Sequence, residues 1–272
     1  MSTDLTMPVA GPVGAGRPPR PRPRWSLWIG LGIVALITWW AGRQIDFTLT
    51  PLFTDFDRGS AIVSRFFDPN WGFIFQVWPR WLETLYIAVI AALVGNGLAL
   101  FISLLASPVT SPNRFTYQAA KTVLSVVRSL PDVAYALLFV AAVSTGALAG
   151  ILALIMFNIG INAKLTSETI DAVDTGPVEA ADAAGANRLQ RAWGAVVPQI
   201  LPSYLSYSLY VFELNIRASV VIGIVGGGGI GAVIMVQLSR FNYENLGAII
   251  VALFAVVFLL DRVSIWFRRR LV

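Results

Sequence analysis

The sequence predicts an all-α protein that crosses a membrane several times, with about six transmembrane helices. Two observations of composition support this prediction. Of the 272 residues, 56% are hydrophobic and only 13% are charged, whereas a soluble domain carries about twice that share of charge. The mean hydropathy is +0.70. A third observation is the arrangement of the apolar residues, which form largely uncharged runs long enough to cross a bilayer.

The chain contains no cysteine and no histidine. Disulfide bonds, zinc sites, thiol nucleophiles and acid–base catalysis by histidine are therefore excluded. A membrane-embedded hydrolase would have to use Ser–Lys or paired carboxylates, and no facing pair of either kind can be argued from the sequence. We therefore expect no catalytic residue, no metal site and no cofactor bound by this chain.

Residues 1–24 form a separate region with six prolines, three glycines and four arginines. This composition has no periodic apolar face and predicts a disordered tail. The four arginines favour a cytoplasmic location for the tail, although a role in lipid binding is the alternative. The next region, residues 25–83, holds the first span and an external segment, and residues 84–272 form the main body.

Six apolar segments are expected to cross the membrane. They cover residues 26–41, 84–106, 119–143, 147–163, 200–225 and 246–267. The first ends in Trp39 and Trp40, which suit a membrane interface. Ser144, Thr145 and Gly146 supply a turn between the third and fourth spans, because the uncharged stretch around them is too long for one crossing.

The distribution of Lys and Arg predicts the orientation of these spans. With the N-terminus inside, the cytoplasmic segments hold twelve basic residues, the external segments hold five, and three lie within spans. Cytoplasmic loops of membrane proteins carry the excess of positive charge. Both termini and residues 164–199 are therefore predicted to be cytoplasmic.

A polar segment at residues 175–198 interrupts the apolar runs. Pro177 suits the start of a helix, and the alanines that follow favour continuing it. Gly185 can end that helix in a left-handed conformation, and a second short helix is expected over 188–196, running to Pro198. The small-residue face can dock into a groove of a cytoplasmic partner. The alternative is an interfacial helix, which would carry bulky apolar residues on one face.

The same segment resembles the EAA coupling motif of ATP-binding-cassette (ABC) importer permeases: Glu-Ala-Ala, three residues, Gly, nine residues, then Ile-x-Leu-Pro. The residues that match are Glu179, Ala180, Ala181, Gly185 and Pro198. Ala195 and Val197 stand in place of the Ile and Leu, which keeps the apolar character of those positions. The resemblance implies that these residues couple the chain to an ATPase.

Longer segments narrow the resemblance to the permeases of phosphonate importers, over about residues 80–270. They are SLPDVAYALLF (129–139), VDTGPVEAADAAGA (173–186), YSLYVFELNIRASVVIGIVGGGGIG (207–231) and FNYENL (241–246). The resemblance implies a type I ABC importer permease fold in the inner (plasma) membrane. It also implies a second copy of the chain and two cytoplasmic ATPase subunits that bind ATP and Mg²⁺. An extracytoplasmic phosphonate-binding protein completes the implied assembly, with membrane lipid around it and no nucleic acid.

Three other transporter classes remain as alternatives. Methionine-importer permeases share the EAA segment and a glycine-rich stretch. An ATP-independent channel or secondary transporter could share the hydropathy, but a secondary transporter would normally show repeated halves, and no repeat is visible. The phosphonate importer is therefore the leading interpretation, with phosphite and phosphate as related substrates.

Three pairs of polar residues lie within predicted spans, each pair four residues apart. They are Arg128 and Asp132, Asn158 and Asn162, and Glu213 and Arg217. Residues four apart share a helix face, and buried charges in membranes usually face the bundle interior. These residues are the candidates for a translocation path for anions. The alternative is mutual neutralisation or hydrogen bonding between helices.

A glycine run at residues 226–231 contains a match to G-x-G-x-x-G. A dinucleotide site would require a preceding strand, and here a membrane span precedes the run. We expect instead a close approach of backbones or a bent re-entrant turn at the external mouth. Gly226, Gly227, Gly228 and Gly229 are thus the candidate external gate.

Overall fold

The computed structural model describes residues 25–271, and all regular elements in this part of the chain are helical. The tail expected at residues 1–24 lies outside the described residues. The α-helices and the π-helical turns (η) are, in chain order, α1 (Trp25–Gln44), α2 (Thr50–Thr54), α3 (Phe56–Phe66), α4 (Trp71–Gln76), α5 (Trp78–Leu105), α6 (Arg114–Ser129), α7 (Asp132–Val143), α8 (Ala147–Asn158), η1 (Ile159–Ala163), α9 (Lys164–Asp171), α10 (Thr175–Ala183), α11 (Arg188–Arg191), η2 (Ala192–Val196), α12 (Val197–Ile222), η3 (Gly223–Gly227), α13 (Gly229–Ser239) and α14 (Tyr243–Leu271).

The chain divides into two units, Met1–Asp57 and Arg58–Val272. The described part of the first unit contains α1 and α2. Helix α1 is 20 residues long and contains the first expected span. Near its end, the guanidinium of Arg43 lies 4.9 Å from the ring centroid of Trp39, a cation–π contact that suits a membrane interface.

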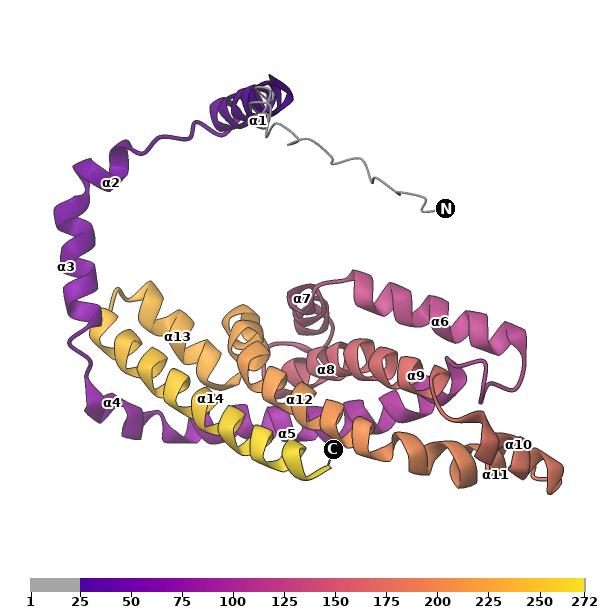
Figure 1. Ribbon diagram of the computed structural model, residues 1–272. Helices are drawn as coiled ribbons and strands as arrows, with labels where there is room; N and C mark the ends of the chain where they lie inside the picture. Colours follow the sequence, from indigo (N-terminus) through magenta and orange to yellow (C-terminus); the bar gives the residue numbers. More distant parts are fainter. Residues whose placement is uncertain (1–24, 272) are drawn as a thin grey trace, which may run out of the picture. The chain divides into compact units, whose positions relative to one another are not determined.

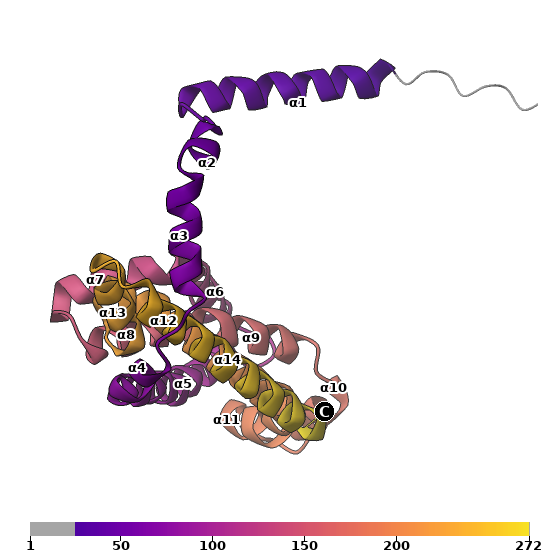
Figure 2. The same ribbon diagram turned by 90° about the vertical axis from the view of Figure 1, so that its left-hand side faces the viewer.

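The second unit is built around α5, which packs against α8, α12 and α13 (Figure 1). Small side chains on α5 make this close packing possible, because Ala88, Ala91 and Ala99 are fully buried. Figures 1 and 2 show α10 and α11 at one end of this unit and α4 at the other. The polar segment therefore projects from the end of the helical bundle.

In the described part of the chain, four helices are long and apolar enough to cross a membrane: Trp78–Leu105, Ala147–Asp171, Arg188–Gly227 and Tyr243–Arg268. The bent pair Arg114–Ser129 and Asp132–Val143 makes a fifth if it is one span. These correspond to the second to sixth expected spans. Helix α1 is not among them, so the count of six stays a prediction.

The third expected span, residues 119–143, is bent within its length. Helix α6 ends at Ser129, α7 begins at Asp132, and the two helices meet at 90°. The cause is Pro131, which forces the residue before it out of the helical region: Leu130 is extended, with ψ 134°. The turn expected after this span is confirmed, with Ser144 and Gly146 at positive φ.

Two spans are longer than expected. Helices α8, η1 and α9 run on to Asp171, and the fifth span begins at Arg188 and continues to Gly227. The prediction that the second short helix stops at Pro198 is therefore wrong. Pro198 lies in the first turn of α12, directly after the π-helical turn η2. A proline is tolerated there because its missing N–H is not needed at that position.

Candidate functional site

The expected coupling segment begins with α10. Asp174 caps this helix, since its Oδ1 accepts a hydrogen bond from the Gly176 N–H at 2.9 Å. Pro177 occupies the third helical position instead of the expected first, still within the turn whose N–H groups need no helical partner. Gly185 has φ +77°, and the Ala186 N–H donates to the Ala181 carbonyl at 3.0 Å. The predicted left-handed stop at Gly185 is confirmed.

Helix α10 is anchored on one side and open on the other. Val178 is buried and Ala181 packs beside it, against a cluster that includes Ile170, Val196 and Ile200. The other motif residues are exposed: Glu179, Ala180, Gly185 and Pro198. The structure thus presents most of the EAA residues to the outside on a face with little side-chain bulk.

Helix α11 is fixed to α10 by Arg191. Its Nη1 lies 3.0 Å from Asp182 Oδ2, and its Nη2 donates to the Val109 carbonyl at 2.9 Å. On either side of Arg191 in the chain, Leu189 is 68% exposed and Trp193 is 45% exposed. The sequence analysis missed these three residues, although two bulky apolar side chains in a polar helix were a visible signal.

We call the exposed residues Glu179, Ala180, Gly185, Leu189 and Trp193 the coupling surface. It combines a flat small-residue area with two large apolar side chains, which is typical of a surface that binds another protein. None of these side chains is a nucleophile with an adjacent base. Among the described residues, no cluster of three or more Asp, Glu, His or Cys side chains could hold a metal ion.

The two candidate path asparagines lie inside the bundle. Asn162 is fully buried; its Nδ2 donates to Asn96 Oδ1 at 2.9 Å and to Ser208 Oγ at 3.1 Å, and its Oδ1 accepts from Thr166 at 3.0 Å. Asn158 is also fully buried and donates to the Ala91 carbonyl at 2.8 Å. These bonds join η1 and α8 to α5 and α12. Both asparagines therefore fit the alternative to a path role, in which they form hydrogen bonds between helices.

The pairing of Glu213 with Arg217 is confirmed, because the two side chains form an ion pair on α12. The Glu213 side chain is only 4% exposed, and it accepts a second contact from Arg268 Nη2 of α14 at 3.2 Å. Sequence spacing could not reveal Arg268, which lies 55 positions away. The buried carboxylate thus links α12 to the end of α14.

For Arg128 and Asp132 the alternative of mutual neutralisation does not hold, because the bend between α6 and α7 separates their helix faces. Among the described residues, no ion pair joins them to each other or to a third residue. Instead, both line one cavity of about 300 Å³ at the bend, together with Tyr135 and Phe157. Arg128 and Asp132 are thus candidate path residues that lie around the same cavity.

The glycine run forms a tight turn between α12 and α13. Gly226, Gly228 and Gly229 have φ of 108°, 82° and 67°. The Gly226 carbonyl accepts from the Gly146 N–H at 2.8 Å, and the Ile230 N–H donates to Thr84 Oγ1 at 2.8 Å. The expected bent turn with close backbone approach is therefore present, and a gate function remains a prediction.

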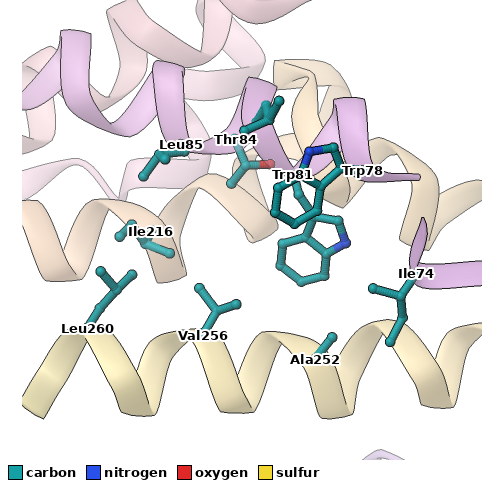
Figure 3. Close-up of a pocket in the computed structure, with 10 residues that line it drawn as sticks. Ile74, Trp78, Trp81, Thr84, Leu85, Ile216, Ala252, Val256 and Leu260 are labelled. Atoms are coloured by element: carbon teal, nitrogen blue, oxygen red, sulfur yellow. The ribbon is translucent and has the colours of Figure 1, made fainter. Parts of the chain in front are cut away.

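A second cavity, of about 170 Å³, lies between α5, α12 and α14. Figure 3 shows Ala252, Val256 and Leu260 of α14 facing side chains of α5 across it. Its lining is apolar and offers no charged group that could hold an oxyanion. We therefore assign it no place in an anion path.

Comparison with known proteins decides the family. Residues 95–272 match the model of the binding-protein-dependent transport system inner membrane component. The chain belongs to this family. It is therefore the membrane component of a transport system and a multi-pass protein of the inner membrane, in agreement with its several apolar helices.

Curated relatives of this family fit the resemblance seen in the sequence. The phosphite transport system permease protein PtxC of Stutzerimonas stutzeri is 34% identical over 240 residues, covering 87% of this chain and 85% of that protein. The phosphate-import permease protein PhnE of Mycolicibacterium smegmatis is 34% identical over 222 residues, covering 81% of this chain. The chain spans only 42% of the length of that PhnE.

Solved structures show the same fold at lower identity. A chain of the MetNI methionine ABC transporter in an inward-facing conformation aligns with a TM-score of 0.64 and 19% identity, over 73% of this chain and 97% of that chain. A chain of an amino acid ABC transporter gives 0.59 and 22%, over 72% and 96%. The predicted type I importer permease fold is confirmed by these likenesses.

Proposed function

We propose that this chain is the permease subunit of an ATP-driven importer of phosphonate or a related oxyanion such as phosphite or phosphate. The observation that carries this proposal is the 34% identity to a phosphite permease over 87% of the chain. Methionine, the alternative substrate, is supported more weakly, since the MetNI likeness at 19% identity concerns the fold alone.

The proposed assembly contains a second copy of this chain, two cytoplasmic ATPase subunits and an extracytoplasmic binding protein. ATP and Mg²⁺ belong to the ATPase subunits, and this chain performs no catalytic chemistry. The coupling surface supports this division, because it offers small and apolar contact area at the cytoplasmic end predicted from the charge distribution. An ATPase groove would receive α10 and α11 there.

Transmission from the ATPase to the membrane would follow the contacts of α11. Arg191 ties α11 to Asp182 of α10 and to the Val109 carbonyl, so the two helices of the coupling surface move together. Helix α11 is connected to α12 through the single π-helical turn η2. A displacement of the docked ATPase would therefore tilt α12, which alternates access to the path.

Hydrolysis by the reconstituted complex tests this function. The chain is combined with its ATPase and binding protein in proteoliposomes, and ATP turnover is measured with and without 2-aminoethylphosphonate. Ala180→Arg and Gly185→Arg place a long cation on the coupling surface, and we expect each to lower stimulated turnover by about tenfold or more, the scale of a lost interface hot spot. Gly185→Arg also strains the backbone at positive φ.

Two control variants isolate the effect of the surface. Gln118→Arg adds the same charge to exposed α6, outside the coupling surface, and should keep wild-type turnover. Gly185→Asn tolerates a left-handed conformation and should retain more activity than Gly185→Arg. Stimulation of ATP turnover by methionine and not by phosphonate would show that methionine, the alternative, is the substrate. Absence of any stable complex with an ATPase would refute the proposed function.

A further inference from the structure

The bend between α6 and α7 places two opposite charges around one cavity without joining them. Arg128 is on the last turn of α6 and Asp132 is the first residue of α7, and both line the cavity of about 300 Å³. Pro131 creates this arrangement, because a continuous helix would have put the two side chains within pairing distance. The bend thus holds a cation and a carboxylate apart.

Neither charge is neutralised by another described residue. The Asp132 carboxylate accepts only the N–H of its neighbour Val133, at 2.9 Å, and no acceptor for the Arg128 guanidinium is found among the described side chains. Glu213, in contrast, has two arginine partners. Unpaired charges within a membrane span are energetically expensive and are usually kept for a function.

The rest of the lining restricts what can bind between these charges. The Tyr135 hydroxyl already donates to the Val127 carbonyl at 2.9 Å, and Met156 and Phe157 are apolar. Gly160 leaves room for the Arg128 stem, since a Cβ there would lie 3.2 Å from Arg128 Cγ. The cavity lining therefore combines one cationic residue, one anionic residue and apolar side chains.

We propose that this cavity is a transport subsite for zwitterionic aminoalkylphosphonates, an inference that rests on the proposed function and names its substrate class. The guanidinium of Arg128 binds the phosphonate oxygens, for which its planar donors are well suited. The Asp132 carboxylate binds the ammonium group, and the alkyl chain lies against the apolar wall. Phosphite and phosphate carry no ammonium, so Asp132 would only repel them.

The test compares two phosphonates that differ in the amine. Proteoliposomes with the full transporter and saturating binding protein take up 2-aminoethylphosphonate or ethylphosphonate, and the ratio of the two rates is measured. Asp132→Asn keeps an oxygen that can accept the Val133 N–H but removes the charge. We expect it to lower the ratio by roughly fivefold, the scale of an ion pair in a partly solvated site.

Two further variants serve as references for that ratio. Arg128→Gln should slow both substrates and leave the ratio within about twofold of wild type, since both carry the phosphonate. Glu168→Gln removes a carboxylate that is 54% exposed and paired with Lys164, outside the cavity, and should leave the ratio unchanged.

Several outcomes would overturn the subsite. An unchanged ratio in Asp132→Asn would do so, as would equal slowing of both substrates. Recovery of transport in the exchanged variant Arg128→Asp/Asp132→Arg would show instead an ion pair made in the assembled dimer. A wild-type complex that transports neither phosphonate overturns the subsite, and one that also fails to transport phosphite and phosphate refutes the proposed function itself.

Discussion

Asn162 shows how a buried polar side chain can hold membrane helices together. Its amide meets side chains of α5, α9 and α12, so all of its hydrogen-bonding groups have partners: Asn96, Thr166 and Ser208. In an apolar surrounding, each of these groups would be expensive to leave unpaired. The residue therefore specifies which faces of the three helices meet.

Removing this amide should destabilise the bundle. Asn162→Ala leaves buried partners such as Asn96 without hydrogen bonds, and we expect a loss of about 1–3 kcal/mol in the free energy of unfolding. The measurement is thermal unfolding of the purified chain in one detergent. Ser239→Ala is the control, because its hydroxyl bonds only within its own exposed helix turn, to Val236. Equal midpoints for the two variants would contradict the role of Asn162.

Two glycines of similar helical setting should respond differently to alanine. A Cβ at Gly150 would collide with the Gly227 carbonyl oxygen of the glycine turn, whereas a Cβ at Gly97 meets nothing within 4 Å. Gly150→Ala should therefore cost about 1–3 kcal/mol of stability. Gly97→Ala should be neutral or stabilising by up to about 1 kcal/mol. Unfolding midpoints measured side by side check both, and a stable Gly150→Ala would disprove the close approach.

At the scale of elements, the contact between α12 and α14 is partly ionic, because Glu213 of α12 meets Arg268 of α14. One carboxylate, 4% exposed, faces Arg217 on its own helix and Arg268 on the other. Only the carboxylate is buried, since the Arg217 side chain is 50% exposed and the Arg268 side chain is 26% exposed. The contact is therefore a link between the helices that depends on the negative charge at residue 213.

Neutralising this carboxylate should loosen α14. We expect Glu213→Gln to lower the free energy of unfolding by about 1.5–2 kcal/mol, the scale of lost hydrogen bonds to a charged group whose partners are partly solvated. Glu168→Gln breaks an exposed pair with Lys164 and should cost less than about 1 kcal/mol. Limited proteolysis at the end of α14, followed together with thermal unfolding, reports the local and global effects. A Glu213→Gln variant as resistant as wild type would show that packing alone holds α14.

At the scale of the whole molecule, the apolar runs predicted the helical membrane class and the approximate places of the spans. They did not give the direction of the chain within a span, since the 90° bend at Pro131 depends on backbone geometry and not on hydropathy. The spacing of four residues predicted the pair of Glu213 with Arg217. It could not predict Arg268 or Asn96, because contacts between distant elements depend on packing and leave no local pattern.

The helical run from Arg188 to Gly227, which passes through the π-helical turns η2 and η3, has a mechanical consequence. Its 40 residues include Pro198 and Pro202, and treated as a rod they reach at most about 60 Å. One end carries Leu189 of the coupling surface, and the other ends in the glycine turn beside Gly146. A rotation of about 5° about one end of such a rod moves the opposite end by about 5 Å. In the proposed importer, a small angular change at the docked ATPase would thus become a displacement of several ångströms at the glycine turn.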